Sequence, residues 1–134
     1  MALFTRSILC TPAISDGLRI SVMSRHTLND GRTLDKRIVL KFGLYHMHWP
    51  ILGPRPKLVG SLKRGEILWD EFEEEYLNDI RSPGKIYFVN MIADLARVMN
   101  VTLLCVEDTP EHCHRRILAE ECQRLKPNLI VKHR

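Results

Sequence analysis

The sequence predicts one α/β domain spanning residues 1–134, with a mixed or parallel central sheet flanked by helices. Three observations predict this class. Residues 101–106 form a short apolar run of strand length, and apolar side chains recur at helical spacing after residue 110. Residues 66–80 have the same helical periodicity, and residues 18–24 alternate apolar with polar side chains as a strand does. Strands that alternate with helices along a chain of this length indicate a single α/β core.

Two strands are predicted near the N-terminus. Residues 3–10 are rich in apolar side chains, and Pro12 marks the end of this run. Residues 18–24 follow, with leucine, isoleucine and valine alternating against arginine and serine. Arg25 comes directly after these residues, so we expect it at the carboxyl end of the second strand.

The middle of the chain is predicted to contain loops and two helices. Residues 29–32 read Asn-Asp-Gly-Arg, which is typical of a turn, and residues 53–65 form a cationic loop rich in proline and glycine. Residues 41–49 are dense in aromatic and imidazole groups, which either stack on a base or, as we favour, cap the sheet edge and fill core. Residues 66–80 predict a helix with an aromatic core stripe and an acidic outer face, and residues 88–100 predict another.

The last third of the chain is predicted to run from strand to helix to strand. Residues 101–106 suit a strand buried on both faces, because the run is almost entirely apolar. Thr109 is the predicted N-cap of the next helix, and Pro110 takes its first position, where no backbone donor is missed. Residues 127–131 are predicted as a last short strand, with residues 132–134 as a solvated tail.

The start of the last helix carries the candidate chemistry. Cys113, His114 and Arg115 precede the apolar stripe by one turn and face the sheet. A helix N-terminus attracts anions and favours a thiolate, Arg115 offers a planar fork for phosphate, and His114 can exchange a proton near neutral pH. In the alternative interpretation, Cys113 is a buried apolar-like side chain and His114 bonds a strand carbonyl. Arg115 then pairs with Glu107 or Asp108.

Arg25 and Glu107 are expected to lie in the same crevice as this helix start. In open α/β sheets, ligands bind beyond the carboxyl ends of parallel strands. Arg25 follows residues 18–24, and Glu107 follows residues 101–106, so the two meet if these strands are parallel. Arg25 is therefore a candidate anion ligand, the alternative being a surface arginine in a turn.

No metal site and no cofactor are predicted. The chain has no C-x-x-C pair, and His112 and His114 diverge by about 200° around a helix. A tyrosine-phosphatase loop is also excluded, because the residue six places after Cys113 is Ala119 rather than arginine. We expect reduced thiols, since a chain of this size without an export signal is typical of the cytoplasm. The four cysteines are Cys10, Cys105, Cys113 and Cys122.

The composition describes a soluble globular protein with a basic balance. Hydrophobic residues make up 45% and charged residues 27% of the chain, and the net charge is +4. This charge permits an anionic small molecule or nucleic acid as partner without demanding one. No apolar run reaches the length of a membrane span, so no membrane association is predicted.

Two groups of motifs carry a family resemblance. Near the C-terminus, the predicted strand ends Leu-Leu-Cys, an acidic residue follows two places on, and the next helix opens Cys-His-Arg. The upstream motifs consist of Asp16, Gly17, Leu18, Arg19, Arg25, Tyr45, Leu52, Gly53 and residues 69–76. Together they resemble the family called domain of unknown function 488, especially its YeaO-like branch. The resemblance covers about residues 7–125. It departs at residues 26–29, where the branch tends to read Trp-Pro-Arg-Gly. It implies a compact α/β fold and supplies no reaction.

The sequence therefore favours an enzyme acting on a phosphate-bearing or nucleotide-like substrate. Cys113 and His114 are the predicted catalytic residues. The predicted substrate-binding residues are Arg19, Arg25, Tyr45, Glu107 and Arg115, of which Arg19 and Tyr45 rest on the family resemblance. The alternatives are a non-catalytic module that binds a nucleotide or nucleic acid with the same pocket, and a purely structural polar cluster. No oligomeric state is assigned.

Overall fold

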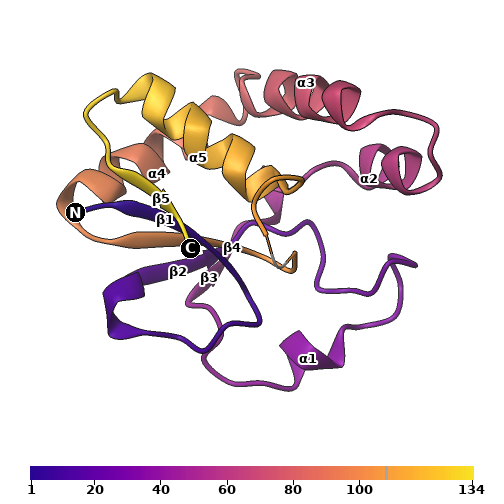
Figure 1. Cartoon of the computed structure of the whole chain (residues 1–134), viewed down its shortest axis with the longest axis horizontal. Helices are drawn as coiled ribbons and strands as arrows, with labels where there is room; N and C mark the ends of the chain where they lie inside the picture. Colours follow the sequence, from indigo (N-terminus) through magenta and orange to yellow (C-terminus); the bar gives the residue numbers. More distant parts are fainter. Residues whose placement is uncertain (108) are drawn as a thin grey trace.

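The computed structural model describes residues 1–107 and 109–134 and contains a five-stranded parallel sheet. The strand order is β3-β2-β4-β1-β5, so the prediction of a mixed or parallel sheet is confirmed in its parallel form (Figure 1). Parallel pairing brings the carboxyl ends of β2 and β4 to the same edge of the sheet. The strands are β1 Leu3–Ser7, β2 Leu18–Ser21, β3 Met47–His48, β4 Val101–Cys105 and β5 Val131–His133.

The helices lie mainly on one face of this sheet. In Figure 1, α2, α3 and α5 lie above the strands, and α1 lies below them in a long connection between β2 and β3. Helix α5 contacts β1, β4, α3 and α4, so it is the central element of the helical layer. The helices are α1 Lys36–Val39, α2 Pro56–Lys63, α3 Trp69–Ile80, α4 Ile86–Val98 and α5 His114–Leu125, with short 3₁₀ turns η1 Ile14–Asp16 and η2 Pro50–Leu52.

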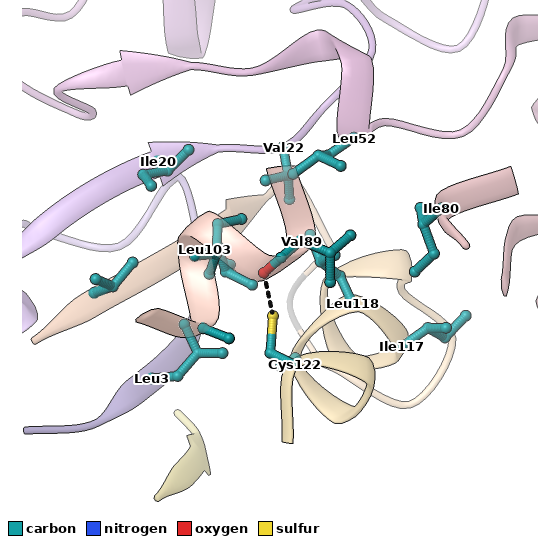
Figure 2. Close-up of a cluster of buried hydrophobic side chains, with 14 of the residues drawn as sticks. Leu3, Ile20, Val22, Leu52, Ile80, Val89, Leu103, Ile117, Leu118 and Cys122 are labelled. Atoms are coloured by element: carbon teal, nitrogen blue, oxygen red, sulfur yellow. Dashed lines mark hydrogen bonds between the residues drawn. The ribbon is translucent and has the colours of Figure 1, made fainter. Parts of the chain in front are cut away.

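The main hydrophobic core fills the space between the sheet and these helices (Figure 2). Leu3, Ile20 and Leu103 come from the three central strands and are completely buried. They lie in one cluster with Leu118 and Cys122 of α5, and the Cys122 thiol lies 3.7 Å from the carbonyl oxygen of Val89. Burial of this apolar surface is the dominant stabilisation of the domain.

The opposite face of the sheet carries a buried ionic network. Arg19 and Ile20 are neighbours in β2, so their side chains leave the sheet on opposite faces, with Ile20 in the main core. Asp16 accepts hydrogen bonds from Arg19 at 2.5 Å, from Arg6 at 2.9 Å and from the backbone N–H of Ala13 at 3.0 Å. Burial alone would raise the pKa of Asp16, but these three donors lower it below its ordinary value.

Two predicted boundaries at the last helix and the last strand are wrong. Thr109 is not the N-cap, because α5 begins at His114 and Cys113, with an extended backbone, is the N-cap. The residues after Pro110 form a turn instead, in which the N–H of Cys113 bonds the Pro110 carbonyl at 3.2 Å. Residues predicted as a solvated tail form β5, which begins where the predicted strand 127–131 ends. Pairing with β1 stabilises this strand, and the residues of β5 alone do not predict that pairing.

Four predicted elements agree with the structure in type and differ from it only at their ends. The strands predicted at 3–10 and 18–24 are shorter, and the helices predicted at 66–80 and 88–100 begin at Trp69 and Ile86. One prediction of type is wrong: the cationic loop 53–65 contains α2. Helix α2 starts with Pro56 at its first position, where proline is well tolerated.

No helix in the described part of the chain is both long enough and apolar enough to cross a bilayer.

Candidate functional site

A cleft of about 420 Å³ opens where the carboxyl ends of β2 and β4 meet the start of α5. We divide its lining into three parts. The reactive floor consists of Cys105, Glu107, Cys113 and His114. The basic rim consists of Arg25, Arg32, Lys63 and Arg64. The aromatic wall consists of Trp69, Phe72 and His112.

The four side chains of the reactive floor lie within a few ångströms of one another. The thiols of Cys105 and Cys113 donate to the same oxygen, Oε2 of Glu107, at 2.6 and 3.4 Å. The Cys105 Sγ also lies 3.7 Å from Nδ1 of His114. Cys105 is the last residue of β4, and Glu107 follows it by two residues, while Cys113 and His114 lie at the start of α5. A strand end and a helix start therefore build the floor together.

The imidazole of His114 has a defined orientation. Its Nε2 lies 2.6 Å from the backbone carbonyl of Val22, and a carbonyl only accepts, so Nε2 carries a proton. In neutral His114, Nδ1 therefore presents its lone pair to the thiols. Burial alone would lower the pKa of His114, but the contacts with Cys113, the Val22 carbonyl and Glu107 raise it above its ordinary value.

The thiol of Cys113 differs from the sequence-based expectation of an acidic group. Burial, together with the neighbouring Cys105, raises the pKa of the Cys113 thiol well above its ordinary range. His114 acts in the opposite direction and only partly offsets this shift. At 2% exposure the thiol is desolvated, which disfavours its charged form. Burial and the nearby Glu121 likewise raise the pKa of the Cys122 thiol, to about 12.

Glu107 joins the reactive floor to solvent. The residue as a whole is exposed, while its carboxylate reaches back to the two thiols. Burial of the carboxylate would raise the pKa of Glu107, but the bond from Cys105, its own backbone N–H and the nearby His114 lower it. Glu107 is therefore ionised at neutral pH and is a hydrogen-bond acceptor in the reactive floor of the cleft.

Arg115 lies behind the floor and does not line the cleft. It is completely buried, its Nη1 donates to the Glu107 carbonyl at 2.7 Å, and the same nitrogen lies 3.6 Å from the Cys113 Sγ. Its Nε and Nη2 have no hydrogen-bond partner among the residues that the structure describes. The predicted pairing with Asp108 concerns a residue outside the described chain. Arg115 thus supports the floor instead of facing the cleft.

The remaining predicted substrate-binding residues divide into one on the cleft and two away from it. Arg25 belongs to the basic rim, where its Nη1 donates to the Gly31 carbonyl at 3.2 Å. Arg19 lies on the opposite sheet face, bonded to Asp16 and, at 2.7 Å, to the Leu44 carbonyl. Tyr45 packs against a second hydrophobic cluster and the ring of His26, 5.0 Å between centroids.

Sequence reasoning did not assign the rest of the basic rim to the site. Arg32 comes from the loop after β2, and Lys63 and Arg64 come from the end of α2. Lys63 Nζ donates to the side chain of Asn29 at 2.6 Å, which joins α2 to that loop, and Arg64 pairs with Glu66. The only sequence signal for Lys63 and Arg64 was the cationic composition of residues 53–65. Its place in the fold could be known only from the packing of α2.

The aromatic wall and Cys105 were also missed as site residues. Trp69 stacks on His112 at 4.8 Å and on Phe72 at 4.9 Å between ring centroids, both at 21°. The aromatic stripe of α3 was predicted as core, which holds for the buried Phe72, whereas Trp69 is half-buried and reaches the cleft. The signal for Cys105 was its position at the end of a buried strand, next to the carboxyl edge where ligands bind.

Comparison with known proteins supplies a family. Residues 4–125 match a family model described as the active DUF488-N3 subclade. Neither the search of curated proteins nor the search of solved structures returned a match. The family model covers most of the chain, including β4, the reactive floor and all of α5. The chain therefore belongs to the family called domain of unknown function 488, as its motifs indicated.

Proposed function

We propose that the protein is an enzyme acting on a small phosphate-bearing or nucleotide-like substrate, which binds in the cleft with its reacting atoms near Cys113 and His114. The observation that carries the proposal is the composition of one cavity, which is lined by the cations of the basic rim, by aromatic rings, and by two thiols with an imidazole and a carboxylate. A cavity of about 420 Å³ falls in the range of small-molecule sites.

The basic rim supports binding of a phosphate group. Arg25, Arg32 and Lys63 are exposed and form no ion pair with any acidic residue of the described chain. Asp30 lies among them, and its carboxylate already accepts bonds from the backbone N–H groups of Arg32 and Thr33. The rim therefore retains cationic groups for an anion, and arginine forks match phosphate oxygens.

The aromatic wall supports a ring next to that phosphate. Trp69 and His112 present stacked rings to the cleft, and a base or sugar can extend such a stack. The exposed carboxylates of α3, Asp70 and Glu71, follow Trp69 directly. Their charge disfavours a long nucleic-acid backbone at this edge, so a nucleotide-sized ligand fits better than a duplex.

The reactive floor supports chemistry more than binding alone. His114 Nδ1, the Glu107 carboxylate and the two thiols are groups that exchange protons, and they converge at one point. The burial of both thiols, at 2 and 3% exposure, favours the second candidate, a binding module with inert cysteines.

Four free cysteines support a cytoplasmic location within this proposal.

Ligand binding and turnover test the proposal separately. Nucleoside monophosphates, phosphosugars and inorganic phosphate are screened by thermal shift and then by calorimetry. We expect the double substitution Arg25→Ala and Arg32→Ala to weaken the best ligand by about tenfold or more, whereas Arg97→Ala, an exposed arginine of α4 outside the cleft, leaves affinity unchanged.

Turnover then distinguishes the enzyme from the binding module. Cys113→Ser and His114→Ala should abolish conversion of the bound ligand while the rim still binds it. Tight binding without turnover by the wild-type protein supports the binding module. Equal affinities in the rim variant and the wild-type protein would rule out the cleft as the anion site.

A further inference from the structure

We propose that Cys105, Cys113 and His114 bind a thiophilic divalent cation, with zinc as the best match and Glu107 at the fourth, cleft-facing position. The Sγ atoms of the two cysteines and a ring nitrogen of His114 lie within 4.8 Å of one another, and all three residues are buried. Tetrahedral zinc, with bonds of about 2.0–2.3 Å, requires ligand atoms roughly 3.5–3.8 Å apart. The Cys105 Sγ to His114 Nδ1 distance of 3.7 Å already meets this requirement.

His114 is oriented as a metal-binding histidine is. A ligating imidazole usually donates its second ring N–H to a carboxylate or a backbone carbonyl, which holds the ring and exposes the other nitrogen. The bond from Nε2 to the Val22 carbonyl, 2.6 Å, has this form, and Nδ1 faces Cys105. The supporting carbonyl is itself buried just beyond β2, so the orientation is built into the core.

The three ligands stand on rigid elements. Cys105 ends β4, Cys113 is the N-cap of α5 and His114 is its first helical residue. The main core holds β4 and α5 against each other, since Leu103 and Leu118 belong to one completely buried cluster. A site formed at the junction of packed elements needs little reorganisation to bind a cation.

Charges around the cluster balance when a divalent cation is present. Two thiolates and the Glu107 carboxylate contribute three negative charges, the cation two positive charges, and Arg115 one more. Arg115 lies 3.6 Å from the Cys113 Sγ and forms no salt bridge with a carboxylate of the described residues, although it is completely buried. A buried cation of this kind requires nearby negative charge, which a thiolate-bound metal centre would supply.

Glu107 is placed to complete the site from the cleft. Its Oε2 lies 2.6 Å from the Cys105 Sγ and 3.4 Å from the Cys113 Sγ, so the carboxylate has to turn away from Cys105 to reach the tetrahedral spacing. If water or substrate replaces Glu107, three protein ligands remain with one exchangeable position, which is typical of catalytic zinc. The inference deepens the proposed function, because the cation would face the same cleft, but cation binding itself does not rest on the substrate.

The sequence-based prediction of no metal site rested on the lack of a C-x-x-C pair and on the assumption that His112 and His114 belong to one helix. His112 instead precedes α5 and stacks on Trp69, while Cys105 supplies the third ligand from a strand. The spacing argument therefore does not apply to the folded chain. A protein that binds no metal, as the sequence predicted, would contradict the proposal in the experiment below.

The experiment measures cobalt and zinc binding to the full chain under reducing conditions. Protein is stripped with a chelator and titrated with Co²⁺, whose absorption reports tetrahedral thiolate coordination. We expect saturation at about one cobalt per chain and displacement by zinc, with X-ray absorption of the zinc form showing two sulfur neighbours. Absence of thiolate-to-cobalt bands in the wild-type protein, or a Cys105–Cys113 disulfide under these conditions, would overturn the proposal.

Matched variants locate the cation. Cys113→Ser should lose the thiolate bands, and Cys122→Ser, a buried cysteine of the same helix outside the cluster, should keep them. Far-UV circular dichroism checks that each variant folds. If Cys113→Ser does not fold, the cobalt bands and the X-ray absorption of the wild-type protein test the site. Unchanged cobalt binding in folded Cys113→Ser contradicts the site. The rim substitution Arg32→Ala should leave cobalt binding unchanged, so loss of anion affinity and loss of metal are read separately.

Discussion

The imidazole of His114 donates a hydrogen bond of 2.6 Å to the backbone carbonyl of Val22, which joins the start of α5 to the end of β2. These residues are far apart in sequence, and both belong to the carboxyl edge of the sheet. The bond satisfies a buried acceptor and turns Nδ1 toward Cys105. A single contact therefore connects the stability of the site to its chemistry.

Loss of that contact should be measurable as a loss of stability. We expect His114→Ala to lower the free energy of unfolding by about 1–3 kcal/mol, because the Val22 carbonyl is left buried without a donor. His112→Ala is the control, since His112 is exposed, and it should change stability by about 0.5 kcal/mol or less. Urea denaturation measures both. Equal effects of the two substitutions would contradict a structural role for the Val22 bond.

The cysteines should react with iodoacetamide in order of exposure. Cys10 is half-buried, whereas Cys105, Cys113 and Cys122 are buried. We therefore expect Cys10 to be labelled first in the native protein, although the position of Cys113 at a helix start favours a thiolate there. Mass spectrometry of peptides after short reaction times gives the order. Protein unfolded in guanidinium, in which all four should react, is the control, and native labelling of Cys113 as fast as Cys10 would refute the prediction.

The buried network around Asp16 should make stability depend on pH in acid. The folded-state pKa of Asp16 is lowered, so its contribution is complete above the unfolded pKa of about 3.9 and is lost as pH falls through the lower folded value. We expect Asp16→Asn to cost about 3–5 kcal/mol at pH 7, because Arg19 is left buried without its partner. The difference between wild type and variant should shrink below about pH 4.

Glu120→Gln is the matched control for Asp16. Glu120 pairs with Arg116 on the exposed side of α5, and such surface pairs contribute about 1 kcal/mol or less. Its substitution should leave the acid limb of the stability curve unchanged. A pH-independent cost for Asp16→Asn would show that the network acts by shape alone.

Gly17 should tolerate no side chain. Its φ is +62°, and an added Cβ would lie 2.0 Å from the carbonyl oxygen of Asn100. Gly43 has φ +77° with no heavy atom within 4 Å of such a Cβ, so it isolates the backbone effect. We expect Gly43→Ala to cost about 1–2 kcal/mol and Gly17→Ala clearly more, because steric overlap adds to the backbone strain. Thermal denaturation compares the two, and equal shifts in Tm would show that the close approach to Asn100 relaxes freely.

The sequence by itself determined the features that depend on local periodicity. The α/β class, the buried strand β4, helices α3 and α4, and a polar cluster at the start of α5 all follow from apolar spacing along single segments. The motif around Cys113 also identified the family, because it is contiguous in the chain. These properties are encoded by neighbours a few residues apart.

Tertiary structure alone decided which side chains meet. Arg19 and Arg25 both belong to the β2 region, but strand alternation sends Arg19 to the opposite face, where Asp16 holds it. Parallel pairing of β2 with β4 brings Cys105 beside His114, and packing of α2 brings Lys63 to the cleft. Contacts between distant segments decide the strand order, the position of β5 and the burial of Arg115. Local sequence patterns do not reveal these features, because they do not report the free energy of such contacts.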